Sequence, residues 1–372
     1  MPGLDEVAIA RLARARDAHL LRSLRETARR GGGLVERLGK ELISLSCNDY
    51  LGLAHDPRVV AAAHQALDEY GAGAGASRLV TGSHPLYARL ERLLAELKGT
   101  ERALVFGSGF LANLGVIPSL VGAGDLVLAD RLCHASMIDA ARMSRATMDV
   151  FDHNDLVHCA SLLGRQRPRH GRCLIMTETV FSMDGDRAPV EELAGLARAH
   201  DAWLLTDDAH GLGVCSSPAA EIQVGTLSKA VGGYGGYVAG SACLIEMLIQ
   251  KAHTLIYTTG LPPATIAAAA VALEIIRDEP ELVRKPLENA RVFTAALGRR
   301  PAESAIVPVV VGTAERALEA AALLEEHGFL VVPIRPPSVP AGTARLRFAF
   351  SARHDPESIA RAAALLIGHG YA

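Results

Sequence analysis

Short apolar runs alternate with helical patterns through the middle of this chain, and this alternation restricts its fold more than any other feature. The apolar runs predict strands at residues 103–106, 126–130, 148–151, 173–177, 203–206, 222–226 and 236–239. Helical patterns lie between most of them, as at Val190–His200. Buried strands joined by helices form a mainly parallel sheet between helix layers. The sequence therefore predicts an α/β fold.

The length of the chain supports more than one lobe. It has 372 residues, of which 49% are hydrophobic, and this is ample for a large core. We expect an N-terminal segment, 1–48, with a helix at 5–30 and a short strand pair around 34–45. A major domain follows at 49–275, and a small α+β domain at 276–372. Strands at 306–311, 329–334 and 345–350 and helices at 316–326 and 356–368 are predicted within the last part.

Composition excludes several classes of function. The net charge of −3 gives no overall field that would attract nucleic acid or an anionic membrane. No apolar run reaches the ~18 residues of a membrane-spanning helix, and Ala264–Ile276 is predicted to be a buried helix instead. The six cysteines are scattered without a CxxC pair, so we expect reduced thiols, no metal site and a cytoplasmic protein.

Polar groups follow four of the predicted strands at the point where each one ends. They are Gly107-Ser108-Gly109, Glu178, Asp207 and, after the strand at 222–226, Lys229. In an open α/β sheet, ligands bind at the carboxyl ends of the strands. The neighbour of Asp207, Asp208, is expected to be structural.

Lys229 lies in the segment TLSKAVGGYGG, residues 226–236. The glycines allow a backbone to approach a ligand closely, and a lysine amine beside such a surface can form a Schiff base with an aldehyde. Taken alone, the segment also fits a solvated lysine before a glycine turn. The polar strand ends upstream favour a functional lysine.

These motifs, together with SCNDYLGL at 46–53 and TARLRFAFSARHD at 343–355, resemble the α-oxoamine synthase family of fold-type I pyridoxal 5′-phosphate (PLP) enzymes over nearly the whole chain. The resemblance implies PLP as cofactor and the three-layer fold of PLP-dependent transferases, with a small C-terminal domain. It also implies a homodimer whose active sites lie at the subunit interface.

The resemblance assigns catalytic roles to four residues. Lys229 would form the Schiff base and move protons at the substrate α-carbon, and Asp207 would keep the pyridine nitrogen protonated. His134 resembles the histidine that stacks on the cofactor, and His210 the one near its phenolic oxygen. The full cofactor-binding set is Ser108, Gly109, Phe110, His134, Glu178, Ser182, Asp207, His210, Thr226, Lys229 and Thr259, the last from a neighbouring subunit.

The resemblance also implies substrate contacts. Arg347 would grip the amino-acid carboxylate, although Arg345 lies on the same strand face and only the motif separates them. Arg335 would meet an anionic group of the acyl donor. The remaining matches to substrate-contact positions are Arg22, Asn48, His134 and Ser338.

Within the family, the segment IRPPSVPAGTARLR favours members that condense L-alanine with pimeloyl-CoA or pimeloyl-acyl carrier protein in biotin biosynthesis. Glycine C-acetyltransferase, 5-aminolevulinate synthase and serine palmitoyltransferase remain alternatives, since all would keep Lys229 and Asp207. A cofactor-free scaffold is a further class, and the presence of Lys229, Asp207 and His210 argues against it.

Overall fold

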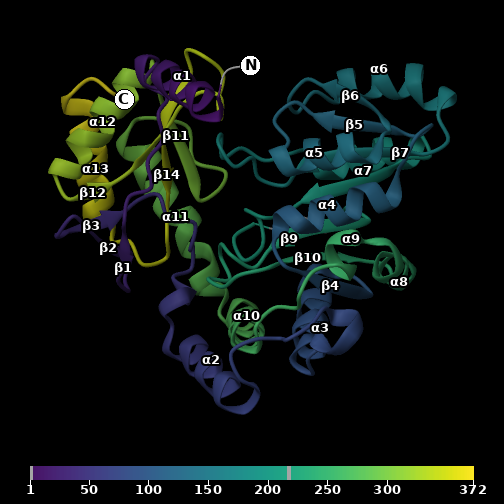
Figure 1. The fold of residues 1–372 in the computed structure, drawn as a ribbon. Coiled ribbons are helices and arrows are strands. Elements are labelled where there is room, and N and C mark those ends of the chain that lie inside the picture. The colour runs from purple at the N-terminus through teal and green to yellow at the C-terminus, as the bar shows by residue number, and fades with distance from the viewer. Residues whose placement is uncertain (1–2, 216–218) are drawn as a thin grey trace. The chain divides into compact units, whose positions relative to one another are not determined.

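The computed structural model describes residues 3–215 and 219–372, and its contacts divide the chain into two compact units (Figure 1). Unit 1 comprises Met1–Cys47, Met183–Gly185 and Pro286–Ala372. Unit 2 comprises Asn48–Ser182 and Asp186–Lys285. Each unit has its own sheets and its own core.

Unit 2 is built on a seven-stranded sheet with the order β4-β10-β9-β8-β7-β5-β6. The strands are β4 (Arg102–Phe106), β5 (Leu126–Asp130), β6 (Thr147–Phe151), β7 (Cys173–Glu178), β8 (Trp203–Asp207), β9 (Ile222–Thr226) and β10 (Gly236–Gly240). Strand β10 is antiparallel to both of its neighbours, and the pairs from β9 to β6 are parallel. The predicted mainly parallel sheet is confirmed, and each of its predicted strands forms.

Helices cover both faces of this sheet (Figure 1). Alternate residues of β5 point to opposite faces. Val127 and Ala129 pack with α4 (Gly109–Leu120), α5 (Ala135–Ser144) and α8 (Ala242–Lys251), whereas Leu126 and Leu128 pack with α6 (Leu156–Gln166) and α7 (Val190–Ala199). The helices of unit 2 are α2 (Pro57–Tyr70), α3 (Leu86–Lys98), α4 (Gly109–Leu120), α5 (Ala135–Ser144), α6 (Leu156–Gln166), α7 (Val190–Ala199), α8 (Ala242–Lys251), α9 (His253–Ile256) and α10 (Pro263–Asp278). The three-layer fold is thereby confirmed, and α10 is the buried helix expected at 264–276.

Unit 1 contains two small sheets. The first has the order β1-β2-β3-β12, from β1 (Ala28–Arg29), β2 (Leu34–Arg37), β3 (Lys40–Ser44) and β12 (Phe329–Leu330). The second has the order β11-β14-β13, from β11 (Ile306–Gly312), β13 (Val332–Ile334) and β14 (Ala344–Ala349). Helices α12 (Ala314–Glu326) and α13 (Pro356–Gly368) complete the unit, and α11 (Pro280–Ala296) contains its boundary with unit 2. Phe293, Phe348 and Phe350 form the centre of its core.

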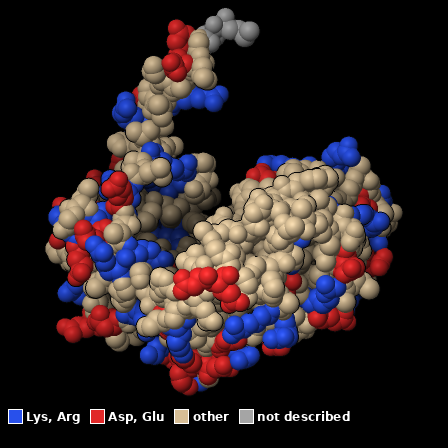
Figure 2. All heavy atoms as spheres, turned by 60° about the horizontal axis from the view of Figure 1, so that its bottom comes forward, with Lys and Arg blue, Asp and Glu red and all other residues tan. Residues whose placement is uncertain are grey.

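Three expectations for unit 1 differ from the structure. The helix expected at 5–30 is α1 (Leu4–Asp17), and it ends before His19, whose φ of 54° is left-handed. No residue of α1 is buried, so no packing extends it, and Figure 2 shows it standing clear of the rest of unit 1. The strand expected at 329–334 is divided, because β12 pairs with β3 and β13 with β14. The pairing of β12 with β3 also joins the expected segments 1–48 and 276–372, which lie largely in one unit.

Lys98 and Asp208 form an ion pair in the core of unit 2, with 2.5 Å between Nζ and Oδ2 and side chains only 1% and 0% exposed. Thr179 donates to the other carboxylate oxygen at 2.6 Å. Burial raises the pKa of Asp208, and the charge of Lys98 opposes that rise. Asp208 therefore has the structural role expected from its position.

Replacement of Lys98 by methionine is expected to lower the free energy of unfolding by about 3–5 kcal/mol, because the Asp208 carboxylate would stay buried without its counter-charge. Urea denaturation measures the loss. Arg92→Met is the matched control, since Arg92 pairs with Glu96 on the surface, where both side chains are at least half exposed. Equal effects of the two variants would contradict a special role for the buried pair.

Among the described residues, no helix is long and apolar enough to cross a membrane.

Candidate active site

The parallel strands of unit 2 bring the polar strand ends to one edge of the sheet. Glu178 ends β7, Asp207 ends β8 and Thr226 ends β9, and these three strands are consecutive neighbours. Ser108 follows β4, which also runs in this direction because β10 is antiparallel to both β4 and β9. The predicted clustering of these residues is therefore a direct consequence of the topology.

Two donors hold the carboxylate of Asp207. Asn113 Nδ2 donates to Oδ2 at 2.8 Å, and the amide of Ala209 donates to Oδ1 at 3.0 Å. Asn113 lies on α4 and also donates to Ser136 Oγ on α5, at 3.0 Å. Sequence reasoning missed Asn113, although it is a polar residue one turn after Gly109 in a mainly apolar helix. It fixes the orientation of the carboxylate that the site needs.

His134 begins α5 and is anchored by that helix. Its Nδ1 accepts from the amide of Ser136 at 3.3 Å and lies 2.8 Å from the Ser136 hydroxyl. Burial lowers the pKa of His134, the charge of Asp207 opposes this, and that of Lys229 adds to it. The imidazole is therefore neutral at neutral pH and its ring is fixed in one place.

Glu178 is buried within the field of the same charges. Burial and the charge of Asp207 raise its pKa, whereas Lys229 and the amides of Ser182 and His134 oppose the rise. Its Oε1 has no hydrogen-bond partner among the described residues. A buried polar atom of this kind marks a place where a bound ligand can supply the missing partner. The pKa of Glu178 thus depends on the charges of Asp207 and Lys229 and on the amides of Ser182 and His134. These residues therefore form one cluster with Glu178.

Tyr50 joins two predicted residues that are distant in sequence. Its hydroxyl lies 2.6 Å from His210 Nδ1 and donates to Asn48 Oδ1 at 3.2 Å. The tyrosine ring is buried, with 1% of its surface exposed. Tyr50 belongs to the motif SCNDYLGL, but its role depends on a contact across 160 residues. It positions the imidazole of His210.

A close-packed helix start lies beside β9, at the position of the predicted phosphate site. Ser108 caps α4, and its Oγ accepts from the amide of Leu111 at 3.1 Å. A Cβ added at Gly109 would lie 3.3 Å from Thr226 Cβ, and one at Gly236 would lie 2.3 Å from the Ser108 carbonyl carbon. Glycine is thus required at 236, and Thr226 adjoins the first turn of α4. Free amides and the helix dipole at such a turn suit a phosphate group.

Phe110 and Thr259 lie on the surface of unit 2. The ring of Phe110 is 44% exposed. Thr259 is exposed and forms an isolated antiparallel bridge with Ser77. Their cofactor contacts stay predictions, and that of Thr259 depends on a second subunit.

Unit 1 separates the roles of Arg345 and Arg347. Both side chains are buried on β14. Arg345 pairs with Asp184 at 2.5 Å and donates to the carbonyl of Met183 at 3.2 Å, all within unit 1. Arg345 is therefore occupied structurally, and the role of Arg347 as the carboxylate ligand stays a prediction from the motif.

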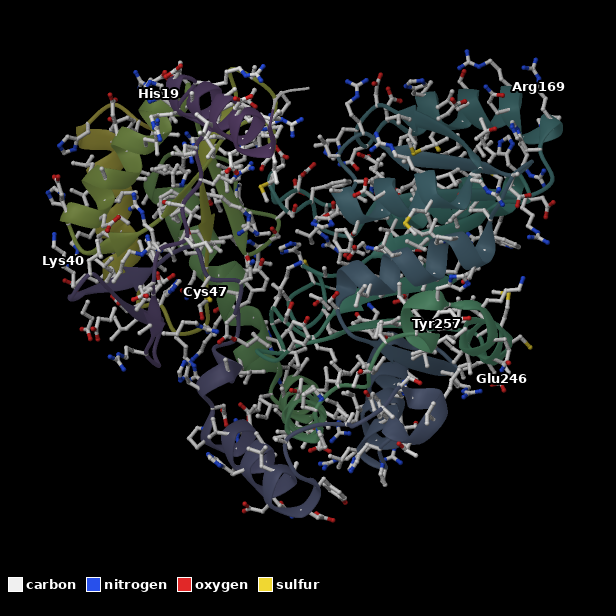
Figure 3. All side chains as sticks on the ribbon, in the orientation of Figure 1. His19, Lys40, Cys47, Arg169, Glu246 and Tyr257 are labelled. Carbon is white, nitrogen blue, oxygen red and sulfur yellow. The ribbon has the colours of Figure 1, made fainter. Side chains whose placement is uncertain are left out.

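A basic cavity of about 670 Å³ also lies within unit 1. Its described lining includes Arg22, Arg335 and Ser338, and the further arginines Arg16, Arg25 and Arg37, against one carboxylate, Glu325. Arg22 donates to Ser338 Oγ at 3.4 Å. Arg335 donates to the carbonyl of His19, the residue labelled beside α1 in Figure 3. Burial and the neighbouring charge of Arg22 lower the pKa of Arg335, so an anion would relieve this repulsion.

Comparison with known proteins identifies relatives over almost the full chain. The sequence model of the family "Aminotransferase class I and II" matches residues 40–366. An 8-amino-7-oxononanoate synthase of Methylobacterium sp. (strain 4-46) is 58% identical over 99% of this chain and 98% of its own length. A putative 8-amino-7-oxononanoate synthase of Acidiphilium cryptum is 54% identical over 98% of both chains.

Solved structures agree with this likeness. A serine palmitoyltransferase from S. paucimobilis, with bound PLP and myriocin, superposes with a TM-score of 0.92 at 30% identity, over 100% of this chain and 98% of its own. The 8-amino-7-oxononanoate synthase of Francisella tularensis superposes with a TM-score of 0.75 at 26% identity, over 89% and 99%.

Proposed function

The chain belongs to the 8-amino-7-oxononanoate synthases, within the class I and II aminotransferase family, and we propose that it condenses L-alanine with a pimeloyl thioester in biotin biosynthesis. It is a PLP-dependent acyltransferase. The observation that carries the substrate assignment is the 58% identity to such a synthase over nearly the whole chain, against 30% to the serine palmitoyltransferase. The cluster of Lys229, Asp207, His134 and Glu178 supports a complete catalytic site.

The residues of unit 2 fit PLP. The first turn of α4 and Thr226 would hold its phosphate, Asp207 its pyridine nitrogen, and Lys229 its aldehyde. Buried Glu178 Oε1 is an available polar atom beside this set. When bound, PLP supplies an electron sink for negative charge at the α-carbon of the substrate.

Different side chains would carry out proton transfer and positioning during the reaction of alanine. Lys229 takes the proton from the alanine α-carbon, and the negative charge of Asp207 would favour a proton on the pyridine nitrogen. His134 would pack against the flat face of the cofactor ring. The imidazole of His210 is held by Tyr50 and lies at the same edge of the sheet. A bond forms between the alanine α-carbon and the thioester carbonyl while the carbon–sulfur bond breaks. The thiol leaves, the carboxyl carbon departs as CO₂, and a proton returns to the α-carbon.

The basic cavity of unit 1 is the candidate site for the anionic part of the acyl donor. Arg22, Arg335 and Ser338 line it, and the paired guanidinium groups favour a carboxylate or phosphate over a neutral chain. Pimeloyl-CoA and pimeloyl-acyl carrier protein both offer such groups. We propose that this cavity, rather than the sheet edge of unit 2, selects the donor.

Replacement of Arg347 by alanine is expected to raise the KM for L-alanine at least about tenfold, with a much smaller change in the KM for pimeloyl-CoA, because a carboxylate clamp is lost. Initial rates with each substrate varied in turn measure the split. Arg345→Ala is the matched control two residues away, and its loss of the Asp184 ion pair is expected to lower stability instead. A larger effect of Arg347→Ala on the acyl donor would reverse the assignment.

We propose a homodimer that covers one apolar patch of unit 2. The patch comprises Leu79 and Val80 on the π turn η2 (Arg78–Gly82), Tyr257 after α9, and Phe110 on α4, each 44–76% exposed. Helix α9 packs against both η2 and α4, so these side chains belong to one region, and Figure 3 labels Tyr257. Contiguous exposed apolar residues of this kind mark association surfaces. Thr259 in the same region would then reach the partner's cofactor.

Replacement of both Val80 and Tyr257 by glutamate is expected to convert the dimer to a monomer and to weaken PLP binding, because charges would be buried at the interface. Light scattering coupled to gel filtration gives the mass, and titration of the apoprotein gives the PLP affinity. A double variant that stays dimeric would place the interface elsewhere.

A cytoplasmic location is proposed from the cysteines. All six, including buried Cys133 and Cys159, are free thiols. Free thiols are typical of reducing compartments.

Product analysis by mass spectrometry tests the proposed reaction. Purified protein with PLP would receive L-alanine, glycine or L-serine, each with pimeloyl-, acetyl-, succinyl- and palmitoyl-CoA. The expected result is 8-amino-7-oxononanoate from L-alanine with pimeloyl-CoA. Product from glycine or serine with another donor, and none from this pair, would overturn the substrate assignment while leaving the fold and cofactor in place.

A further inference from the structure

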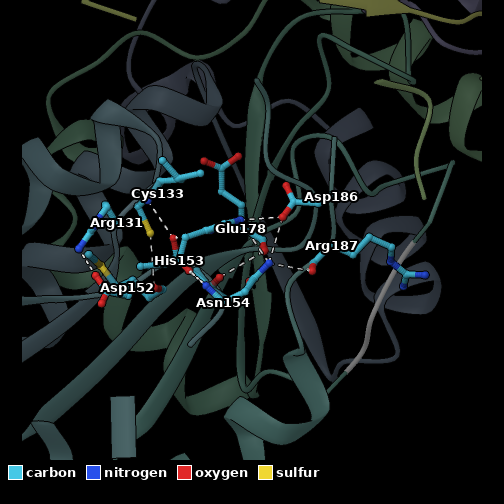
Figure 4. A network of polar contacts seen from close by, with 12 residues as sticks. Arg131, Cys133, Asp152, His153, Asn154, Glu178, Asp186 and Arg187 are labelled. Atoms are coloured by element: carbon cyan, nitrogen blue, oxygen red, sulfur yellow. Dashed lines mark hydrogen bonds and ion pairs between the residues drawn. The ribbon is translucent and has the colours of Figure 1, made fainter. Parts of the chain in front are cut away.

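His153 lies between two carboxylates at the ends of three strands of unit 2 (Figure 4). It follows β6, with Nδ1 3.0 Å from Asp130 Oδ1 and Nε2 2.6 Å from Asp186 Oδ2. Its ring packs edge to face with Phe181, with 4.3 Å between centroids. Ionised carboxylates only accept hydrogen bonds, so both ring nitrogens must donate, and the imidazole must be a cation. No step of the proposed reaction uses this group.

The protonation of His153 is consistent with its surroundings. Burial lowers its pKa, but the hydrogen bonds to Asp130 and Asp186 outweigh burial and raise the pKa to about 10. The cation is therefore present throughout the physiological pH range. It balances two carboxylates that would otherwise repel each other.

The Asp130 side of this contact fixes the turn that leads to His134. Asp130 ends β5 and is fully buried. Besides His153, its carboxylate accepts from the amide of Leu132 at 2.8 Å and from the amide of Asn154 at 2.9 Å. Leu132 lies two residues before His134, so the carboxylate sets the path of the chain into the active site.

The Asp186 side fixes the turn that follows β7. Asn154 Nδ2 donates to Asp186 Oδ2 at 3.1 Å and to the carbonyl of Arg187 at 3.2 Å. The amide of Phe181 donates to the carbonyl of Asp186 at 3.0 Å, which joins the two ends of the turn. Ser182 follows Phe181 directly, and its amide acts on Glu178. Asp186 therefore holds the segment that carries Ser182.

We propose that His153 is a positioning residue, whose cation ties the turn carrying His134 to the turn carrying Glu178 and Ser182. Without it, the two carboxylates would lose the cation that bridges them, and the turns would separate. The role deepens the proposed function and rests on it, because His134, Glu178 and Ser182 are the residues assigned to the cofactor and substrate. Partners that orient functional groups in this way typically change affinity or activity 10–100-fold when lost.

The variant His153→Gln tests this, with His158→Gln as the matched control. His158 lies five residues further on, in α6, where its Nδ1 accepts from the amide of Asp152 at 3.2 Å. For His153→Gln we expect PLP binding to the apoprotein to weaken at least about tenfold. Hydrogen exchange should accelerate in peptides covering 130–134 and 178–187, and kcat should fall more than the KM for L-alanine rises. His158→Gln should stay within about twofold of the wild type, because glutamine can still accept from the amide of Asp152 and the contacts of His158 with Asp152 involve neither Asp130 nor Asp186.

Unchanged PLP affinity and unchanged exchange in His153→Gln would overturn the proposal, even with a lowered melting temperature. If that variant does not fold, Asp186→Asn provides the second test, because it keeps the contact with Asp130. It must weaken PLP binding and accelerate exchange at 178–187, and failure to do so also overturns the proposal. PLP affinity and exchange need no turnover. A wild type that binds PLP and makes no aminoketone would therefore refute the proposed function separately.

Discussion

Replacement of Lys229 by alanine is expected to abolish turnover and the visible absorbance of bound PLP. General base catalysis alone contributes about 10²–10⁴ in rate, and this lysine is also assigned the bond to the cofactor. We therefore expect a loss of at least about 10⁴-fold in kcat. The structure supports an amine in this place, because the charge of Lys229 acts on both His134 and Glu178.

The measurement is a rate assay with L-alanine and pimeloyl-CoA, together with an absorbance spectrum before and after borohydride. Lys251→Ala is a suitable control, since Lys251 is an exposed lysine at the end of α8 in the same unit. PLP still bound without the visible band would agree with the assignment. Activity within tenfold of the wild type would show that another residue provides the amine.

The fold of unit 2 could be predicted because most of its strands are short apolar runs, and three of them end in Glu178, Asp207 and Thr226. Asp207 and Thr226 end buried strands separated by helical patterns, which is typical of a parallel sheet, so their common edge follows from the pattern. Local signals of this kind do not depend on distant partners. The same is true of the glycines around Lys229, where Gly236 packs against Ser108 without room for a Cβ.

Residues whose roles depend on distant contacts could not be predicted. Asn113 reaches Asp207 across 94 residues, and His153 reaches Asp186 across 33. The polarity of Asn113 in a mainly apolar helix is its one local signal, and that signal does not show which distant residue it contacts. The helix expected at 5–30 failed for a related reason: its local pattern is helical, but the left-handed His19 ends it, and Arg22 then contacts Ser338 across 316 residues.

The pairing of Arg345 with Asp184 is a third case. The alternation of the strand places Arg345 and Arg347 on one face, and only the position of Asp184 distinguishes them. Asp184 belongs to a three-residue segment, Met183–Gly185, that joins unit 1 from the middle of the unit 2 sequence. The order of helices and strands along the sequence does not indicate that this short segment belongs to unit 1.

Replacement of Asp207 by asparagine is expected to lower kcat by about 10²–10⁴-fold with little change in overall fold. The variant is nearly isosteric, but it removes the negative charge that would keep the ring nitrogen protonated. Both carboxylate oxygens of Asp207 now accept a hydrogen bond, one from Asn113 and one from the amide of Ala209. In the variant, an NH₂ group that can only donate replaces one of these oxygens. The rate of α-proton exchange from L-alanine in deuterated water isolates this effect, because that step precedes any contact with the acyl donor.

Two neighbouring variants separate charge from geometry and from stability. Asn113→Ala removes one donor to Asp207 but keeps the charge, so its loss in proton exchange should be much smaller, about tenfold, the size expected when a charged group loses one hydrogen bond. Asp208→Asn removes a charge at the next position, but that carboxylate is bonded to Lys98, so stability should fall instead of rate. Equal rate losses in Asp207→Asn and Asn113→Ala would mean that orientation, rather than charge, is what Asp207 supplies. An Asp207→Asn enzyme with normal proton exchange would remove Asp207 from the catalytic set altogether, since the electron sink depends on a protonated ring nitrogen.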